Sequence, residues 1–171
     1  MNEVRMKRLQ SDEKAVRDLA RAHPRIDVEG VSGNPPDRYI LIISVPGLRR
    51  QSEELVGAKT HKLEIRLPRE YPRDAPVCRM LTPVFHPNIA PHAVCIGDHW
   101  TAAESLDLLI QRVGEMICFQ SYNTMSPLNG HASQWADENR HRLPLLRTEF
   151  FVDMQPESET QEPADGGESC A

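Results

Sequence analysis

The side chains best suited to chemistry lie in one short window, His86-Pro87-Asn88-Ile89-Ala90-Pro91-His92-Ala93-Val94-Cys95-Ile96-Gly97-Asp98-His99-Trp100. The stretch from residue 68 to residue 91 contains six prolines, which exclude a helix because each removes an N–H donor and restrains the preceding residue. Irregular backbone on a rigid scaffold is where reactive groups are usually presented. Among the four cysteines, Cys95 is therefore our candidate reactive residue.

Three kinds of chemistry fit this window. In the first, a Cys95 thiolate attacks an activated carbonyl, and an amide donor such as Asn88 stabilises the oxyanion. The second is a zinc site, although the spacing of its candidate ligands matches no standard motif; they are His86, His92, Cys95 and His99. The third is a protease-like pair in which His92 or His99 is the base for Cys95, without a third residue to orient it.

The other cysteines have structural interpretations. Cys78 begins a short predicted strand, Cys118 lies in an apolar helical segment, and Cys170 is near the C-terminus. No CxxC pair occurs, so we expect neither a metal nor another cofactor. The N-terminal residues contain no apolar stretch, and no apolar run approaches the ~18 residues of a membrane helix. We therefore expect a cytoplasmic protein with reduced thiols that binds no membrane.

Hydrophobic periodicity predicts the elements that position this window. An amphipathic helix is expected over residues 3–21, where Lys and Arg outnumber the acids and form either a solvated face or a docking face. Strands are expected at 26–31 (weakly), 38–45, 61–67 and 77–81. Consecutive strands with helices kept apart from them indicate an α+β fold with an antiparallel sheet.

The second half of the chain is expected to be helical. An apolar stripe with spacing i, i+3, i+4, i+7 predicts a central helix within residues 101–119, capped either by a Thr101–Glu104 capping box or by Ser105. Two shorter helices are expected at 129–141 and 144–152. The apolar face of the first holds Ala132, Trp135 and Ala136.

The net charge of −5 is concentrated at one end of the chain. Residues 153–171 hold six acids and no Lys or Arg, so the remainder carries a net charge of about +1. We expect one domain at 1–152 followed by a disordered acidic tail at 153–171. The mildly acidic total also argues against a nucleic-acid partner.

Taken in order, a series of short motifs resembles the ubiquitin-conjugating enzyme family over roughly residues 5–150. The matching pieces are Lys7-Arg8-Leu9, Leu63-Glu64-Ile65, Pro68, Tyr71-Pro72, Pro76, Thr82-Pro83, Phe85-His86-Pro87-Asn88-Ile89, Val94-Cys95-Ile96, Trp100 and Ser126-Pro127-Leu128-Asn129. The resemblance implies an N-terminal helix, a four-stranded antiparallel meander, a crossover helix and C-terminal helices.

The resemblance also implies a function. Cys95 would accept the C-terminal carboxyl group of a ubiquitin-like protein from an activating enzyme as a thioester, and pass it to an amine, usually a lysine, of a protein substrate. Asn88 would order the loop and stabilise the oxyanion, while His86 and Pro87 would shape the loop. The alternative is a catalytically inactive relative that serves as a binding module, but such variants lack the cysteine.

Further roles follow from position in the family pattern. Ser126 falls where the family often has a residue that orients the incoming amine, although a serine before proline is also ordinary turn chemistry. Asp98 and Trp100 would support the site. The first helix would dock the activating enzyme through Arg5, Lys7 and Arg8.

The sequence departs from the family pattern in its loops. The gaps from Asn88 to Cys95 and from Cys95 to Trp100 are short, and Gly97 stands where an aspartate is common. Arg73 and the stretch Thr101-Ala102-Ala103 replace the apolar and Ser-Pro-Ala ligase contacts, so a ligase partner of the typical RING type is not expected. Such compact loops resemble those of bacterial ubiquitin-like conjugation systems.

Overall fold

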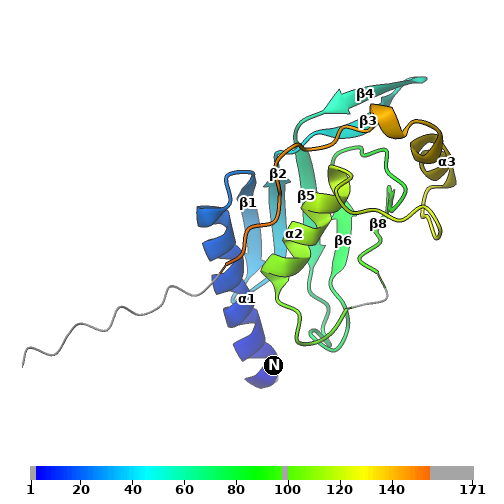
Figure 1. Ribbon diagram of the computed structural model, residues 1–171. Coiled ribbons are helices and arrows are strands. Elements are labelled where there is room, and N and C mark those ends of the chain that lie inside the picture. Colours follow the sequence, from blue (N-terminus) through cyan, green and yellow to red (C-terminus); the bar gives the residue numbers. More distant parts are fainter. Residues whose placement is uncertain (1–2, 98–99, 155–171) are drawn as a thin grey trace, which may run out of the picture.

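The computed structural model describes residues 3–97 and 100–154 (Figure 1). The helices within these residues are α1 (Glu3–Ala22), α2 (Leu106–Ile117) and α3 (Gly130–Glu138), with a 3₁₀ turn at Arg140–Arg142. The strands are β1 (Ile26–Gly33), β2 (Pro36–Ile43), β3 (Gly47–Gln51), β4 (Glu54–Ala58), β5 (His61–Arg66), β6 (Val77–Met80), β7 (Ile89–Ala90) and β8 (Ala93–Val94).

The main sheet is antiparallel, with strand order β1-β2-β5-β6. Its register aligns one row of apolar side chains: Leu41 lies opposite Leu63, and Leu63 lies opposite Met80. Because side chains alternate between the two faces of a strand, this row forms a continuous inner face. The predicted α+β class and four-stranded antiparallel sheet are confirmed.

Helices α1 and α2 cover the inner face of the sheet (Figure 1). Both present apolar stripes that are almost completely buried; the α1 residues are Leu9, Val16 and Leu19, and the α2 residues are Leu106, Leu109, Ile110, Val113 and Ile117. The apolar stripes predicted from the helical periodicity are therefore buried in the core, as expected. None of the helices in the described residues is long and apolar enough to cross a membrane.

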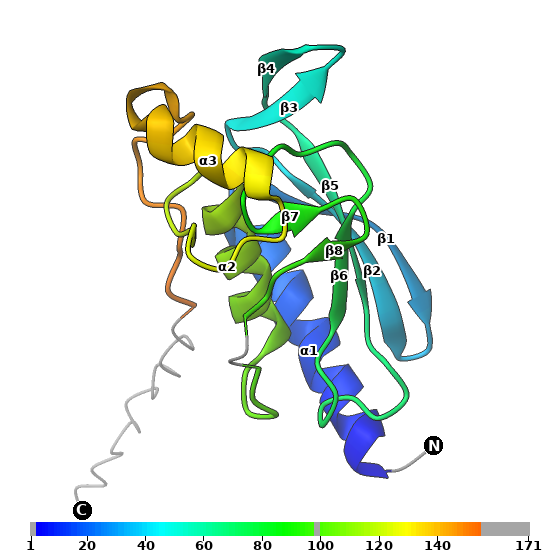
Figure 2. The same cartoon turned by 90° about the vertical axis from the view of Figure 1, so that its right-hand side faces the viewer.

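The sequence interpretation missed a β-hairpin between β2 and β5. Strands β3 and β4 pair with each other outside the main sheet and lie, with α3, at the end of the molecule opposite the start of α1 (Figure 2). Leu48 of the hairpin joins Phe85, Phe119, Ala132 and Ala136 in a small second core. The hairpin thus helps to support the segment that precedes β7, and the apolar face predicted for the helix at 129–141 is confirmed.

The predicted helix at 144–152 is wrong. This segment runs back extended along α2 (Figure 1), and its backbone is bonded by side chains of other elements. Gln120 Nε2 donates to the Thr148 carbonyl at 2.7 Å, and Gln111 Oε1 accepts from the Val152 N–H at 2.7 Å. Phe150 is buried against Gly114, where a Cβ atom would lie 2.1 Å from the ring. These tertiary contacts outweigh the local preference for helix.

Of the tail predicted at residues 153–171, the structure describes residues 153 and 154. Met154 is partly buried and packs against the main core. The rest of the predicted tail, residues 155–171 with Cys170, lies outside the described residues, as do Asp98 and His99.

Candidate functional site

The His86-Pro87-Asn88 segment forms a tight turn that leads into β7. His86 is completely buried, and its Nδ1 accepts a hydrogen bond from the Asn88 N–H at 3.0 Å. Its ring packs on Phe119, with 4.5 Å between ring centroids. Burial lowers the pKa of His86 to about 3, so the imidazole is neutral near pH 7. His86 therefore shapes the turn, and its Nδ1 is not available to a metal or a proton.

The side chain of Asn88 joins two segments that are distant in sequence. Its Nδ2 donates to the Asn123 carbonyl at 2.7 Å, and its Oδ1 accepts from the Asn123 N–H at 2.8 Å. This pair of bonds resembles the pairing of two peptide groups. Only one of the two Nδ2 hydrogens takes part, so the amide keeps one donor hydrogen. No pattern in the sequence points to Asn123, because a residue that bonds through its backbone can be of any type.

The loop that carries Ser126 is held against the same turn. The Pro87 carbonyl accepts from the N–H groups of Leu128 and Asn129, at 2.9 and 3.0 Å. Ser126 itself is exposed, and in the sequence it lies between Asn123, which bonds to Asn88, and the Leu128–Asn129 pair, which bonds to Pro87. The structure therefore brings the segments of Asn88 and Ser126 together.

Cys95 directly follows the short β7–β8 hairpin. Its N–H donates to the Asn88 carbonyl at 2.9 Å, which attaches the cysteine to the turn. The Cys95 side chain is half-buried, whereas Cys78 and Cys118 are buried. Burial raises the pKa of the Cys78 thiol to about 12 and also raises that of Cys118. Among the described cysteines, Cys95 is thus the one suited to nucleophilic chemistry.

The remaining candidates of the window are dispersed. The Trp100 Nε1 donates to the Pro72 carbonyl at 2.9 Å, so Trp100 ties the end of the window to the loop after β5. His92 is exposed in the β7–β8 turn. Within residues 3–97 and 100–154, no three His, Cys, Asp or Glu side chains gather in a metal-binding group.

The three basic residues proposed for docking have different environments. The Arg8 side chain is 16% exposed and forms an ion pair with Asp12 at 2.8 Å. Arg5, with 13% of its side chain exposed, donates to the Leu67 and Pro68 carbonyls at 3.3 and 3.2 Å. Lys7 is 73% exposed and forms an ion pair with Glu3, which is 79% exposed. Lys7 is therefore the most accessible of the three to a partner.

The sequence interpretation missed the role of Asp12. This carboxylate is 1% exposed, and it accepts from the Tyr71 hydroxyl at 2.5 Å and from the Leu106 N–H at 3.2 Å. The contact with Leu106 satisfies a free N–H at the start of α2. Ser105 is the N-cap residue, as one of the two predictions had it, but its side chain makes no capping bond. An acidic residue from another helix thus does the capping.

Comparison with known proteins places these features in a family. The family model described as "Ubiquitin-conjugating enzyme" matches residues 50–144, more than half of the chain. A curated relative from Arabidopsis thaliana, ubiquitin-conjugating enzyme E2 3, is 26% identical over 115 residues, which is 65% of this chain and 75% of the relative.

The fold comparison agrees with the sequence comparison. A solved structure of a ubiquitin conjugating enzyme from Trypanosoma cruzi aligns with a TM-score of 0.57 at 19% identity, covering 81% of this chain and 93% of that one. At this identity the match concerns the fold alone. Together with the family match over residues 50–144, these findings lead to one conclusion: the chain belongs to the ubiquitin-conjugating enzyme family.

Proposed function

We propose that this protein is an active conjugating enzyme for a ubiquitin-like protein, with Cys95 as the residue that carries the modifier. The observation that supports this most directly is the placement of Cys95. Cys95 is half-buried, and its backbone N–H is bonded to the Asn88 turn, whereas Cys78 and Cys118 are buried in the core. A thiol that carries a protein modifier must be reachable by two large partners in turn.

In the first step, the Cys95 sulfur attacks the thioester carbonyl that joins the modifier to an activating enzyme. A C–S bond to Cys95 forms, and the C–S bond to the activating enzyme breaks. The proton lost by Cys95 balances the thiolate that leaves, so no net charge accumulates. Both bonds are thioesters, and an ordinary cysteine is nucleophilic enough for this exchange.

In the second step, an amine of the acceptor protein attacks the Cys95 thioester. A C–N bond forms, the C–S bond breaks, and the amine proton balances the departing thiolate. The thioester is already activated, so the site has to position the amine and stabilise the oxyanion rather than supply a strong base. Neutral, buried His86 is consistent with this requirement, because it cannot act as that base.

Asn88 is our candidate for oxyanion stabilisation. Its bonds to Asn123 fix the orientation of the amide and leave one hydrogen of Nδ2 unused. A preorganised donor of this kind stabilises developing charge without reorganisation. Exposed Ser126 lies on the same loop as Asn123, and we assign it a role in orienting the acceptor amine.

We assign the docking of the activating enzyme to the exposed side of α1 near Lys7. The buried contacts of Arg5 and Arg8 give these residues a structural role as well. Arg73, 76% exposed and paired with Glu70 and Asp74, is a charged residue on the loop after β5. It supports our view that a RING ligase of the typical kind is not the partner.

A charging assay tests this function. The full chain is incubated with ATP and with candidate pairs of activating enzyme and ubiquitin-like modifier. We expect an adduct that disappears on treatment with a thiol reductant and that Cys95→Ala abolishes, while Cys78→Ala retains it. If no pair yields such an adduct, or if Cys95→Ala still charges, the chain is a binding module rather than an enzyme of this mechanism.

A further inference from the structure

A basic stripe, formed by Lys7, Lys14 and Arg21, runs along the exposed face of α1. The three side chains are 73%, 80% and 71% exposed. They follow one another at intervals of seven residues, which is close to two turns of an α-helix, so they lie in line and about 10.5 Å apart along the axis. The opposite face of the helix is the buried one, formed by Leu9, Asp12, Val16 and Leu19.

The acids of α1 offset the charge of the basic stripe only in part. Lys7 pairs with Glu3 at 2.7 Å, whereas Lys14 and Arg21 share Asp18, at 2.5 and 3.5 Å. Over the whole helix, six Lys and Arg stand against four Asp and Glu, a net charge of +2. Surface pairs of this kind are weak, so their cations remain available to another anion. A hollow of about 340 Å³ lies over the same face, and every residue that lines it belongs to α1.

The acidic part of this chain carries carboxylates with a matching spacing. Glu159, Glu162, Asp165 and Glu168, the acidic series, occur at every third position, and residues 155–171 contain no Lys or Arg. In an extended chain three residues span about 9–10 Å, which is close to the ~10.5 Å between the cations of the basic stripe. Pro163, within the series, favours extended backbone. The two sets of charges therefore match in sign and in period.

The described structure brings the chain close to α1 just before the acidic series. The Phe150 carbonyl is bonded to His23, which directly follows α1, and Met154 packs against the core that α1 helps to form. From Met154, five residues lead to Glu159 and span at most about 16–18 Å, more than the ~10–12 Å diameter of a helix with its side chains. The acidic series can therefore reach the exposed face of α1.

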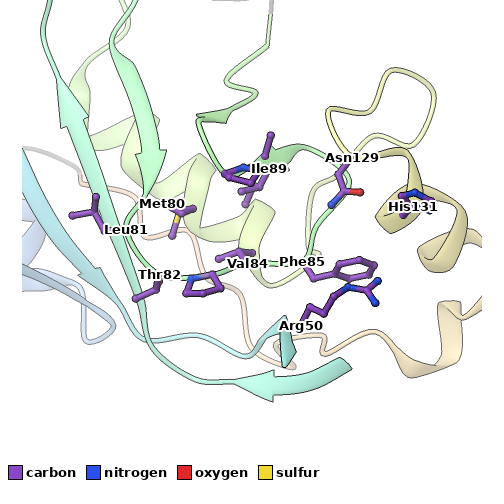
Figure 3. Close-up of a pocket in the computed structure, with 12 residues that line it drawn as sticks. Arg50, Met80, Leu81, Thr82, Val84, Phe85, Ile89, Asn129 and His131 are labelled. Carbon is purple, nitrogen blue, oxygen red and sulfur yellow. The ribbon is translucent and has the colours of Figure 1, made fainter. Parts of the chain in front are cut away.

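Two other basic places suit the acidic series less well. The groove beside the β3–β4 hairpin offers Arg50 at one end, while apolar side chains such as Met80 and Leu81 line the other (Figure 3). Residues 155–171 contain no Leu, Ile, Val, Met, Phe, Tyr or Trp to fill that end. On the sheet, three arginines already surround one buried carboxylate, that of Glu64, so they form a cluster rather than a row.

From the matching charges we propose that residues 159–168 lie in extended form along the basic stripe and compete with the activating enzyme for it. Each cation of the stripe meets one carboxylate of the acidic series. Lys7 belongs both to the stripe and to the surface that we assigned to the activating enzyme, so the contact slows charging without involving the Cys95 site. This regulatory part rests on the proposed function, whereas the contact between the two segments does not.

The proposed contact depends on ionic strength. The Debye length falls from ~30 Å at 0.01 M salt to ~3 Å at 1 M, and pairs between exposed charges weaken accordingly. The two segments belong to one chain, so their effective concentration is high and does not change on dilution. The contact should therefore form at low salt at any protein concentration and be released at high salt.

Paramagnetic relaxation in the uncharged full chain tests the contact. A nitroxide is attached to Cys170 in the Cys95→Ser variant, in which Cys78 and Cys118 are buried and unreactive. At low salt we expect stronger broadening of the NMR signals from the amides of α1 than from those of α3, and recovery in about 0.5 M salt. Broadening that spares α1, or that salt does not change, would overturn the inference.

Two sets of substitutions separate the basic stripe from charge in general. The stripe variant should lose the broadening of α1; it combines Lys7→Gln, Lys14→Gln and Arg21→Gln. The control has the same net charge and should keep the broadening, because it replaces three exposed arginines on other elements: Arg49→Gln, Arg73→Gln and Arg140→Gln. Equal broadening in the two variants would contradict a specific contact with the stripe.

Two variants of the acidic segment test the series itself. The neutral variant should lose the broadening; it combines Glu159→Gln, Glu162→Gln, Asp165→Asn and Glu168→Gln. The shifted variant keeps the charge and breaks the period of three; it combines Gln161→Glu, Glu162→Gln, Ala164→Asp and Asp165→Ala. It should broaden α1 less than the wild-type sequence does. If it broadens α1 equally, the matched period that underlies the inference is wrong.

Charging at low salt tests the regulatory part. The neutral variant should show an apparent KM for charging about threefold lower than wild type, as expected if the stripe is free for about a third of the time in wild type. The maximal rate should be unchanged, and the two KM values should coincide in about 0.5 M salt. An equal KM at low salt would overturn the competition.

These outcomes are distinguishable from a failure of the proposed function. If wild-type protein forms no thioester with any activating enzyme, the proposed function fails, and the broadening of α1 still decides whether the contact exists. If charging is normal and α1 shows no broadening, only the inference about the acidic series fails.

Discussion

Two buried polar side chains, Asp12 and Asn88, connect distant parts of this protein in different ways. Asp12 is 1% exposed and Asn88 is 4% exposed, so each must find partners within the fold. Asp12 accepts from Arg8, from Tyr71 and from the first N–H of α2. The Asn88 side chain bonds to the backbone of the exposed loop at Asn123 and keeps one amide hydrogen.

The difference separates scaffold from site. The Asp12 contacts join α1, the loop after β5 and the start of α2. In each of them the acceptor is the Asp12 carboxylate, and the contact with Arg8 is an ion pair. Breaking them should lower the stability of the whole fold rather than affect one reaction step. The Asn88 contacts order a single loop beside Cys95, so their loss should affect a reaction step more than the fold.

The largest expected effect is on stability at Asp12. Asp12→Ala leaves Arg8, Tyr71 and the Leu106 N–H without their common partner, and the free energy of unfolding should fall by about 3–5 kcal/mol. Chemical denaturation of the purified variants measures this. The control is Asp18→Ala, which removes surface ion pairs with Lys14 and Arg21 and should lower the free energy of unfolding by at most about 1 kcal/mol. Equal losses in both variants would refute the scaffold role of Asp12.

The second effect separates the two reaction steps at Asn88. Asn88→Ala should charge normally but discharge to an amine about a hundredfold more slowly, the typical loss on removal of one oxyanion donor. Single-turnover discharge to free lysine measures the rate. In the control, Asn123→Ala keeps the backbone groups that bond Asn88, so its discharge should be near normal. A normal rate in Asn88→Ala would show that this side chain has no catalytic role.

The smallest effect is on the pH dependence of stability. Burial lowers the pKa of His86 to about 3, so between that value and 6.5 the unfolded chain binds a proton that the folded chain does not. The free energy of unfolding should therefore fall as the pH decreases through this window, by at most about 1.4 kcal/mol per pH unit for one proton.

His23 and His61 have pKa values that burial also lowers, so they add to the slope with the same sign. The arginines around Glu64 lower its pKa to about 2 despite its burial, and its contribution is lost only below its usual value of 4.5. Between pH 4.5 and 6.5 the histidines are therefore opposed by Glu115, whose pKa is raised by burial and by nearby Glu149, and the difference between wild type and a His86 variant isolates His86. His86→Gln should flatten the dependence, and an unchanged slope would show that His86 is not the neutral buried group described above.

The sequence was informative where a local pattern decides the structure. The alternation of Leu63 and Ile65 with polar residues predicted β5, and the prolines predicted the irregular stretch that carries the Asn88 turn. The order of short motifs around Cys95 led to the family that the comparisons support.

The failures arose where distant contacts decide the structure. Residues 144–152 have helical character, but Gln111 and Gln120 bond their backbone in an extended form. No local pattern announces that Asp12 will cap α2, because the two residues are brought together only by packing on the sheet. The β3–β4 hairpin was missed because its strands lack a clear apolar pattern: four of their ten residues are exposed and polar.

The central claim, that Cys95 carries the modifier, is tested most directly by trapping the adduct at that position. In Cys95→Ser the modifier should form an oxygen ester, which resists thiol reductants and is cleaved by hydroxide. After proteolysis, mass spectrometry should locate the remnant of the modifier on the peptide that contains position 95. A remnant on a peptide that contains Cys78, Cys118 or a lysine instead, with position 95 unmodified, would contradict the account.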